Sequence, residues 1–587
     1  MSKFFKLFFA MLLALVVISV IGFFLLLGAV SLVTSKSKPA VGDKAILVLD
    51  LSKQYQDFEN PSLTISLNPN KLTSSPPNLH EVLSMIRYAG TDDGIKAIYL
   101  KAGSNPNGFA SSQEIRDALK TFQLSGKQVI AFSPTMTQKS YYIASVADRV
   151  YVSPVGGVEW SGLVTQMMFF KGLLDKLEIQ PEIFYAGKFK SATEPFRTDH
   201  MSDANRLQVN MWLGEIYGQI LQGVAENRKT DTATLHLLAN EGRIRTANDA
   251  LQNKLVDGLI YPDQVDDELH RLTKTEPSDP LNLISIDKYN QAADYKDYSG
   301  TDRIALLVAQ GDISEGQGHE GIKSDEYVTM LRKIRKDSSI KAVVLRINSP
   351  GGSALASDLI WREITLTKKV KPVIISMGDL AASGGYYIAC NGSYIFADPT
   401  TITGSIGVFS ILGNTEKFFK NKLGITFDEV KTAEHADLGS MARPLTQVER
   451  NWMQASVDSI YYTFKQRVAD GRHKSMAYID SIAQGRVWTG AHAVKIGLVD
   501  SLGSLHDAIL YAARQIHSKS YRISTYPVKK SLLQQFLKSD NEEENIDLKL
   551  MSKQMSPEML SVYQEIKSIQ ASMNQVQTKL PFHFTIQ

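Results

Sequence analysis

The chain alternates short, strongly apolar runs with stretches in which apolar residues recur at helical spacing. Runs typical of buried strands lie at residues 45–49, 95–100, 304–308, 342–347, 373–376 and 394–397. Helical periodicity is found at residues 327–335, 354–367 and 448–470, and around Tyr386. Because strands and helices alternate, the pattern predicts an α/β fold with a mostly parallel sheet and helical crossovers.

This pattern occurs twice along the chain. The segment Ile95–Leu100 is similar to Ile340–Leu345, and Tyr141–Ala144 is identical to Tyr386–Ala389, both at a separation of 245 residues. Further matches at that separation are Pro154 with Pro399 and Gly162 with Gly407, and residues 242–246 and 255–257 match 485–489 and 498–500 at a separation of 243. Single short matches arise by chance, but several in one register predict a duplicated domain.

The duplication suggests a division of the chain into two repeats, residues 44–276 and 302–520. A connection that contains Pro, Asn and Gly, residues 277–301, separates them. Residues 34–43 are small and polar and predict a tether before the first repeat. The C-terminal extension, residues 521–587, has no counterpart in the first copy, and its Lys-, Gln- and Glu-rich later part predicts a peripheral helix or a mobile tail.

The amino end predicts a membrane anchor. Residues 7–33 are 27 apolar or small residues without a charge. At about 1.5 Å per residue, a helix of this length crosses a hydrocarbon core of roughly 30 Å. A buried soluble helix is seldom so apolar, and a cleaved secretory peptide has an apolar core of only about 7–15 residues, although Lys3 and Lys6 resemble its basic start. We interpret residues 1–33 as one uncleaved transmembrane signal anchor.

Lysines flank the anchor on both sides, so the distribution of positive charge decides its orientation only weakly. The short segment before it favours an amino terminus inside the cytoplasm. The rest of the chain is therefore expected outside the cytoplasm.

Composition narrows the classes of function. The 587 residues are 43% hydrophobic and 21% charged, as in ordinary globular proteins, which excludes a wholly disordered or fibrous chain. The formal net charge of +3 gives no indication of a nucleic-acid-binding surface, and no nucleic-acid partner is expected. A single cysteine, Cys390, excludes an intramolecular disulfide and any multi-cysteine zinc or iron–sulfur site.

Candidate chemistry lies in the second repeat, where the glycine-bearing turns Asn348–Gly352 and Gly378–Gly385 follow adjacent predicted strands. In the second turn Ser383 stands between Ala382 and Gly384, at a strand-to-helix junction. Small neighbours let a substrate approach such a serine, and the helix start supplies N–H groups and positive potential. By itself the pattern is equally typical of turn glycines and a helix-capping serine.

The N–H of Gly384 and one from Gly351 or Gly352 are candidate donors to an oxyanion, and one such donor is worth on the order of 3 kcal/mol of barrier. Comparison of the copies favours this functional interpretation. At the separation of 245, Ser383 corresponds to Gln138, Gly384 to Lys139, and Gly351–Gly352 to Pro106–Asn107. The first copy keeps the strands but lacks the hydroxyl and the glycines, an asymmetry that the fold alone does not require.

A serine nucleophile needs a base, and the residues leave two candidates open. His435, in the polar segment Ala433–Asp437, would give a Ser–His–Asp arrangement. Lys190, in the segment Tyr185–Phe196, stands among aromatic and small residues, where burial would lower the amine pKa and leave a neutral general base. A lysine in a loop is more often a solvated surface charge. The separation of 245 places Lys190 opposite His435, so the second copy lacks this lysine.

Four segments in order strongly resemble the long form of the signal peptide peptidase A (protease IV) family: Lys188–Phe196, Asn348–Gly352, Ala381–Gly385 and Thr403–Val408. The resemblance covers about residues 44–520, together with the anchor and the doubled layout. It implies tandem duplicated Clp protease–crotonase-like βαβ superhelix domains, preceded by one transmembrane helix. It also implies a serine peptidase that works with a Ser/Lys dyad.

Carried onto this chain, the resemblance assigns a nucleophile, a general base and oxyanion donors: Ser383, Lys190, and the glycines Gly351, Gly352 and Gly384. The Lys-Ser-Ala-x-Glu-Pro-Phe context favours Lys190 over its neighbour Lys188. The implied reaction is acyl transfer without a metal or another cofactor. Because the first repeat supplies the lysine and the second the serine, neither repeat should be active alone.

The resemblance further implies a bowl-like homotetramer with a single-pass anchor in the bacterial inner (cytoplasmic) membrane. Its catalytic domains are then expected on the periplasmic side, where it degrades cleaved signal peptides and other short peptides. An enzyme tethered beside the bilayer meets the apolar part of a cleaved signal peptide there.

Two other functions fit part of the pattern. A crotonase-like acyl-coenzyme A enzyme would use the glycine turns as its oxyanion hole, but its cofactor is cytoplasmic and the body of this chain is expected outside the cytoplasm. A non-catalytic membrane scaffold would not need intact serine–glycine turns.

Overall fold

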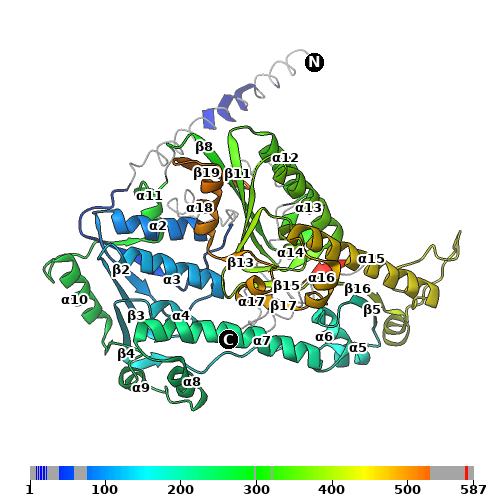
Figure 1. The fold of residues 1–587 in the computed structure, drawn as a ribbon, viewed down its shortest axis with the longest axis horizontal. Helices are drawn as coiled ribbons and strands as arrows, with labels where there is room; N and C mark the ends of the chain where they lie inside the picture. The colour runs from blue at the N-terminus through cyan, green and yellow to red at the C-terminus, as the bar shows by residue number, and fades with distance from the viewer. Residues whose placement is uncertain are drawn as a thin grey trace.

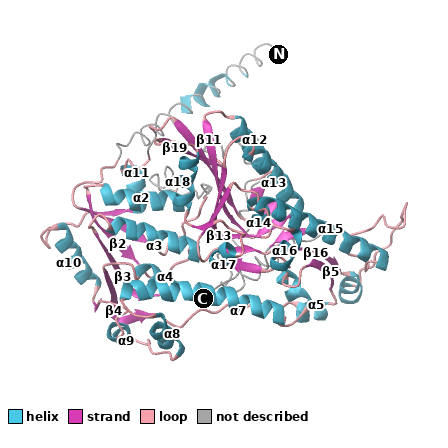
Figure 2. Cartoon of the chain, viewed as in Figure 1, coloured by secondary structure: helices cyan, strands magenta, loops and turns pink. Residues whose placement is uncertain are grey.

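The computed structural model describes residues 39–58, 76–296, 299–318, 321–528 and 576–579, with scattered residues between 8 and 22. These residues form two α/β lobes side by side (Figure 1). The long helix α7 (Asp203–Arg228) runs beneath both lobes in this view. In each lobe helices pack against a sheet (Figure 2), so the expected mixed α/β architecture is present.

The first repeat is built on a sheet of parallel strands in the order β6-β4-β3-β2-β1-β7. Its strands are β1 (Ala45–Asp50), β2 (Ile95–Lys101), β3 (Gln128–Met136), β4 (Arg149–Val158), β6 (Gly258–Leu259) and β7 (Leu283–Ser285). Its helices, besides α7, are α2 (Leu79–Thr91), α3 (Phe109–Gln123), α4 (Gln138–Ala144), α8 (Thr232–Asn240), α9 (Ala247–Gln252), α10 (Pro262–Thr273) and α11 (Ile286–Ala292). Strand β1 is apolar and mostly buried, as a parallel strand covered on both faces requires.

The second repeat has a sheet in the order β17-β15-β13-β11-β8-β19, to which β14 and β18 attach through β13. Its strands are β8 (Asp302–Gln310), β11 (Ile340–Ser349), β13 (Val373–Ala382), β14 (Tyr394–Ala397), β15 (Ile402–Gly404), β17 (Val487–Thr489), β18 (Ser501–Leu502) and β19 (Tyr521–Tyr526). Its helices are α12 (Ser324–Lys336), α13 (Ala354–Lys368), α14 (Gly384–Ala389), α15 (Gln447–Arg472), α16 (Met476–Ile482), α17 (Gly490–Lys495) and α18 (Leu505–Gln515). The runs and periodic stretches predicted in this half therefore form the expected strands and helices.

The two copies also agree at their ends. Strand β7 pairs in parallel with β1, and β19 pairs in the same way with β8. Strand β7 and helix α11 lie within residues 277–301, where a connection was expected, and β19 begins where the second repeat was expected to end. Each copy thus returns a late strand to the edge beside its first strand.

A third sheet joins the copies, in the order β10-β9-β12-β20-β16-β5. Its strands are β5 (Gln180–Ala186), β9 (Ile313–Ser314), β10 (Ile322–Lys323), β12 (Gly351–Ser353), β16 (Val408–Asn414) and β20 (Gln577–Lys579). Strand β5 belongs to the first copy and pairs antiparallel with β16 of the second. The short helices α5 (Lys171–Leu177) and α6 (Glu194–Arg197) flank β5 along the chain.

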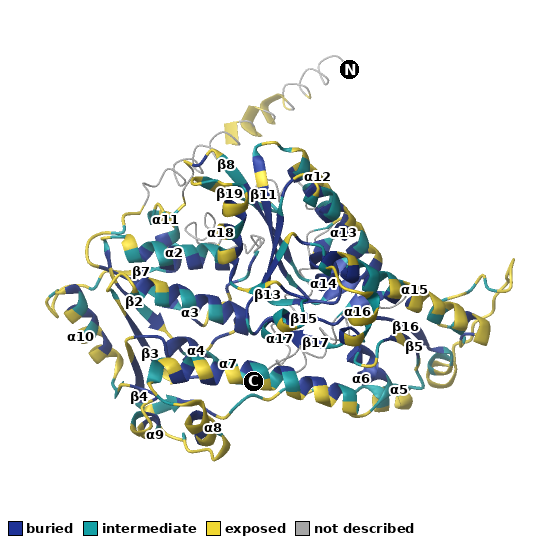
Figure 3. Ribbon diagram, in the orientation of Figure 1, coloured by how far each residue is buried: buried dark blue, intermediate teal, exposed yellow. Residues whose placement is uncertain are grey.

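Burial follows the sheets, while the outward faces of the helices are exposed (Figure 3). An ion cluster lies in the buried contact between the copies. The guanidinium of Arg346, on β11, donates to the carboxylate of Asp57 at 2.9 Å and to that of Glu114 at 3.0 and 3.1 Å. All three side chains are nearly or fully buried, so this contact fixes the second repeat against the first.

The predicted anchor at residues 7–33 falls mostly outside the described residues. In the part of the chain that the structure describes, no helix combines the length and apolar character that crossing a bilayer needs. The greater part of the C-terminal extension, residues 529–575 and 580–587, is also outside the described residues.

Candidate active site

Ser383 lies at a sharp turn between strand β13 and helix α14. Its backbone has φ +55° and ψ −114°, a conformation that a residue with a Cβ seldom adopts and that costs about 1–3 kcal/mol. The Ser383 N–H donates to the carbonyl of Gly404 at 2.8 Å, which ties the turn to strand β15. The strand-to-helix turn predicted here is therefore present, in a strained form typical of nucleophile elbows.

Lys190 reaches this turn because β5 of the first copy pairs with β16 of the second. The pairing places Ala186 opposite Val408 at the end of β5. The chain then turns at Gly187, which has φ +112°, and Lys190 precedes a 3₁₀ turn at Ser191–Thr193. A backbone ladder between the copies thus delivers the lysine to the second copy.

The amine and the hydroxyl meet. Lys190 Nζ and Ser383 Oγ are 2.8 Å apart, although 193 residues separate them in the chain. Nζ also donates to Ser405 Oγ at 3.1 Å and to the Ser405 carbonyl at 3.3 Å. Lys190 is 1% exposed and Ser383 0%. Loss of solvation by this burial holds the pKa of the Lys190 amine well below its usual range, which favours the neutral amine.

Two glycines make room for the lysine. A Cβ added to Gly485, which has φ +73°, would lie 2.6 Å from Lys190 Cβ. A Cβ at Gly407 would lie 3.1 Å from Lys190 Cδ. The second copy therefore encloses the lysine stem in a channel that larger residues would close.

The glycines predicted as oxyanion donors lie beside the serine turn. Gly351 has φ +99° and Gly352 φ +155°, and a Cβ at Gly351 would lie 2.5 Å from the backbone nitrogen of Gly384. The N–H of Gly351 itself donates to Ser349 Oγ at 3.1 Å. The N–H of Gly384 is at the first residue of α14, where a helix has no internal acceptor for it.

The alternative bases lie elsewhere. Lys188 is exposed. His435 is 3.0 Å from a carboxylate oxygen of Glu449, and its ring packs edge-on against Trp452. Among the described residues no histidine hydrogen-bonds to Ser383, so a Ser–His arrangement does not form in this structure.

In the first copy a glutamine stands at the position equivalent to Ser383. The side-chain oxygen of Gln138, which corresponds to Ser383, accepts from the N–H groups of Ser161 and Gly162 at 3.0 and 2.9 Å. This side chain occupies the turn, with its oxygen hydrogen-bonded and its buried amide nitrogen without a partner, and it offers no nucleophile.

Sequence reasoning missed Ser405, which provides two acceptors to the Lys190 amine. Its backbone has φ +50°, so a second strained residue faces the same group. The only indication in the sequence was that Ser405 lies in the segment Thr403–Val408. That segment contributed to the family resemblance, but the resemblance assigned no role to this serine.

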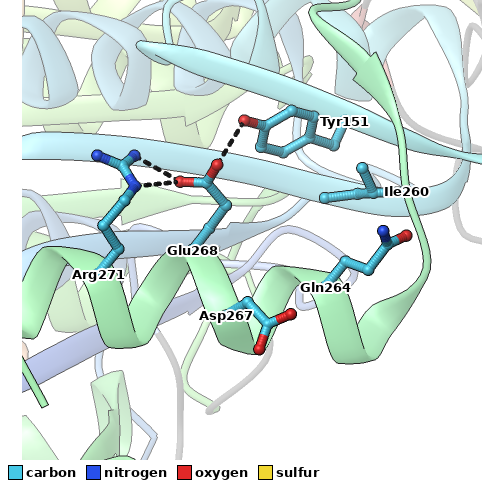
Figure 4. Close-up of a pocket in the computed structure, with 6 residues that line it drawn as sticks. All are labelled: Tyr151, Ile260, Gln264, Asp267, Glu268 and Arg271. Carbon is cyan, nitrogen blue, oxygen red and sulfur yellow. Dashed lines mark hydrogen bonds and ion pairs between the residues drawn. The ribbon is translucent and has the colours of Figure 1, made fainter. Parts of the chain in front are cut away.

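A surface cavity of about 290 Å³ lies on the first copy, between β4 and α10 (Figure 4). It is lined by Tyr151, Ile260, Gln264, Asp267, Glu268 and Arg271. Helix α10 is at the opposite end of the molecule from β5 and β16 (Figure 1), so this cavity is separate from the Ser383 site. Within the described ranges, no group of three His, Cys, Asp or Glu side chains is arranged to hold a metal ion.

Comparison with known proteins gives the family. The profile of peptidase family S49 matches residues 121–276 and 365–519, once in each copy, and the Clp protease profile matches residues 296–401. Protease 4 of Salmonella typhi is 36% identical over 477 residues, which cover 79% of this chain and 76% of that protein. Protease 4 of Haemophilus influenzae is 34% identical over 522 residues, which cover 85% of this chain and 84% of that protein.

A third relative, a putative signal peptide peptidase SppA of Enterococcus faecium, is 37% identical over 213 residues, which cover 35% of this chain and 62% of that protein. The doubled family match and the long alignments confirm the resemblance to the long form of signal peptide peptidase A. They favour a peptidase over the acyl-coenzyme A enzyme and the non-catalytic scaffold. The chain belongs to peptidase family S49 and is a serine peptidase.

Proposed function

We propose that this chain is a membrane-anchored serine endopeptidase that cleaves peptides with a Ser383/Lys190 dyad. The observation that supports it most is the distance of 2.8 Å between Lys190 Nζ and Ser383 Oγ, both buried. Within the described residues, the polar contacts of Nζ are hydroxyls and a carbonyl, not a carboxylate that would hold a proton on it. A neutral amine beside a serine hydroxyl is the arrangement that activates the nucleophile.

Acylation begins when the Lys190 amine accepts the Ser383 proton while Oγ attacks the carbonyl carbon of the peptide. The new C–O bond moves the carbonyl electron pair onto oxygen and gives a tetrahedral oxyanion. When this species collapses, the C–N bond breaks, and the Lys190 ammonium gives its proton to the leaving amine. An acyl ester on Ser383 remains.

Deacylation uses the same groups. Water gives a proton to the Lys190 amine as its oxygen attacks the ester carbon. Collapse of the second oxyanion breaks the bond to Ser383 Oγ, which takes the proton back and releases a carboxylic acid product. The two N–H groups of the neutral amine fit the two acceptors of Ser405, and this leaves the nitrogen lone pair directed to Ser383.

The oxyanion is assigned to the glycines around the turn. Gly384 contributes an N–H at the start of α14, which also has positive potential. A Cβ on Gly351 would lie 2.5 Å from the Gly384 nitrogen, so glycine at this position leaves that donor uncovered, whereas a Cβ on Gly352 would lie 1.9 Å from the Ile313 carbonyl oxygen of β9. Because the Gly351 N–H donates to Ser349, we assign the larger share of stabilisation to Gly384.

The proposed substrates are cleaved signal peptides and other short peptides, as the name of the Enterococcus faecium relative suggests for that protein. The proposed place is the bacterial inner membrane, with residues 7–33 as a single-pass anchor and both repeats on the periplasmic side. The apolar length of residues 7–33 supports the anchor. The expected assembly is a homotetramer.

The test of the dyad uses the full chain and a fluorogenic peptide with a signal-like apolar core. Ser383→Ala and Lys190→Ala should each lower kcat at least about 10³-fold, because either one removes the activated nucleophile. Lys188→Ala is the matched control, since it removes an exposed lysine from the same segment and should retain activity. Hydrolysis that survives in Lys190→Ala and is lost in His435→Ala would overturn the assignment.

A further inference from the structure

The start of helix α7 contacts both copies. Figure 1 shows α7 beneath the two lobes, and the sixth residue of this helix is Gln208. The Gln208 side chain is 2% exposed. Its amide makes hydrogen bonds on two sides, to the segment of the first copy that carries Lys190 and to strand β17 of the second copy.

On one side the amide nitrogen binds the two neighbours of Lys190 in the chain. Gln208 Nε2 donates to the Phe189 carbonyl at 3.1 Å and to Ser191 Oγ at 3.1 Å. Lys190 stands between these two contacts. The amide therefore holds the backbone from which the lysine side chain extends to Ser383.

On the other side the amide oxygen binds strand β17. Gln208 Oε1 accepts from the Val487 N–H at 3.2 Å. Val487 pairs with Gly404 of β15, and the Gly404 carbonyl accepts from the Ser383 N–H at 2.8 Å. A series of contacts thus runs from the residues beside the base, through one glutamine, to the turn of the nucleophile.

A buried network sets the orientation of this glutamine. Nε2 also donates to Asn205 Oδ1 at 3.1 Å, and Asn205 Nδ2 donates to a carboxylate oxygen of Glu194 at 2.8 Å. The hydroxyl of Ser202, the N-cap of α7, donates to the other oxygen of Glu194 at 2.5 Å. Because a carboxylate only accepts, Asn205 turns its nitrogen to Glu194 and its oxygen to Gln208. Gln208 then presents its nitrogen to Asn205, which leaves its oxygen for Val487.

The second copy uses the same helix start to hold the residue that corresponds to Lys190. Helices α7 and α15 both have 26 residues, and the sixth residue of α15 is Trp452. Its ring packs edge-on against His435, which corresponds to Lys190 and is also 3.0 Å from an oxygen of Glu449, the third residue of α15. Contact between this helix start and this segment is therefore a feature of the duplicated unit, and in the first copy it holds a lysine.

From this geometry we propose that Gln208 is a positioning residue for the reaction, because its amide fixes the backbone of Lys190 relative to the Ser383 turn. The proposal rests on the proposed function, since it concerns how the same dyad is held. The hydrogen bonds of Gln208 go to the neighbours of Lys190, to Asn205 and to β17, so Gln208 acts through the lysine and not on the substrate.

Loss of these hydrogen bonds should also change the protonation of the base. The groups around the Lys190 amine are the hydroxyls of Ser383 and Ser405 and the ring of Phe409, whose centre is 5.9 Å away, and these three groups are uncharged. Burial is the cause of the lowered pKa of the amine. A segment that is no longer held admits water to the amine. Water raises the amine pKa and moves the rise of kcat/KM to higher pH.

Two variants of the full chain separate hydrogen bonding from packing. Gln208→Met keeps the length of the side chain and removes its polar atoms, so the partners of the amide lose their hydrogen bonds and no space is left for water. Gln208→Ala leaves a space in which a water molecule can bind the same partners. With the fluorogenic peptide, Gln208→Met should lower kcat about 10²-fold, the effect of a displacement of roughly 1 Å, and Gln208→Ala about tenfold. KM should change less than about twofold in both, because the substrate is not contacted.

The pH profile distinguishes positioning from a loss of folded protein. The rise of kcat/KM in Gln208→Met should lie about one pH unit above that of the wild-type chain. A smaller folded fraction would lower kcat and leave the profile where it is, and that result would overturn the proposal. Gln222→Met is the matched control, because it makes the same change at an exposed residue of α7 and should alter neither quantity.

Hydrogen exchange gives a measurement that does not depend on activity. The N–H groups of Lys190 and Ser191 donate to the carbonyls of Gly187 and Phe189. In Gln208→Met these amides should exchange at least about tenfold faster, as followed by mass spectrometry of peptides from this segment. The amides of β5, which pair with β16, should keep their rates.

The outcomes separate this proposal from the proposed function. Equal kcat of wild type and Gln208→Met would overturn it, as would a lower kcat in Gln208→Ala than in Gln208→Met, which is the order that packing alone would give. If Gln208→Met does not fold, the pH profile and exchange rates of Gln208→Ala decide in the same way. If Lys190→Ala retains hydrolysis, the proposed function fails, and faster exchange in Gln208→Met would still establish that Gln208 holds the segment. If Lys190→Ala is inactive while both Gln208 variants behave as wild type, the dyad stands and this inference fails.

Discussion

Replacing Lys190 with methionine tests how the buried amine is held. Methionine keeps the length of the side chain and removes its charge. Because burial lowers the pKa of Lys190, the folded chain releases this proton at a pH at which the unfolded chain, with a lysine pKa of about 10.4, still binds it. Below the folded-state pKa the buried charge destabilises the native state in full. The penalty decreases as pH rises and disappears above the unfolded-state pKa.

The magnitude follows from proton linkage. Between the two pKa values the unfolded state binds one more proton than the native state, so the free energy of unfolding of the wild-type chain should rise by about 1.4 kcal/mol per pH unit relative to Lys190→Met. Urea unfolding of both chains between about pH 6 and 9 measures this difference. The methionine variant should be the more stable chain at the acidic end.

Lys188→Met is the control, because it makes the same chemical change two residues away at an exposed lysine. Its stability relative to wild type should not depend on pH in this range. If the curves of wild type and Lys190→Met run parallel, the amine keeps its proton on folding. Lys190 would then be no neutral base, and the reasoning from burial would be refuted.

The remaining predictions concern the surroundings of the dyad. The kcat/KM of the wild-type chain should rise with pH through the lowered pKa of Lys190 and then level, and a flat profile would contradict a titrating base. Ser405→Ala should lower kcat about tenfold and move that rise to lower pH, since an acceptor that favours the ammonium form is lost. Gly485→Ala should destabilise the chain by about 1–3 kcal/mol in urea unfolding and reduce activity, because its Cβ would meet Lys190 Cβ at 2.6 Å. Glu114→Ala should cost about 3–5 kcal/mol by the same measurement, because it leaves the charge of Arg346 buried with one partner fewer, and unchanged stability would contradict a structural role.

Much of the scaffold could be predicted from the sequence because the signals are local. The apolar run at 342–347 lies in β11, and the periodic stretch at 448–470 lies in α15. A strand buried on both faces is apolar throughout, and a helix buried on one stripe has apolar residues at helical spacing, so both can be recognised from a short stretch of sequence. Ser383 could be found for a related reason: its glycine turn stands out once the copies are compared.

The parts that could not be predicted depend on contacts between distant segments. Strand β5 pairs with β16, and this pairing brings Lys190 to its place. Both strands are short and apolar, and the sequence of neither one indicates the other as its partner. The role of Ser405 depends on its backbone, which has a positive φ. This conformation is not predicted from the sequence at a residue other than glycine. Strand β20 is three residues long and lies in an extension for which the composition predicted a helix or a tail.

The two copies show where the protein keeps conformational strain. In the first copy α4 begins one position earlier, with Thr137 as an ordinary N-cap: φ is −67° and its side chain accepts from the Ser140 N–H. In the second copy Ser383 stands before α14 with φ +55° and no side-chain cap. In the first copy the equivalent turn is relaxed because its helix includes one more residue, Gln138. Ser383 keeps its strained backbone, and because its side chain caps no helical N–H, its hydroxyl is left to the Lys190 amine at 2.8 Å.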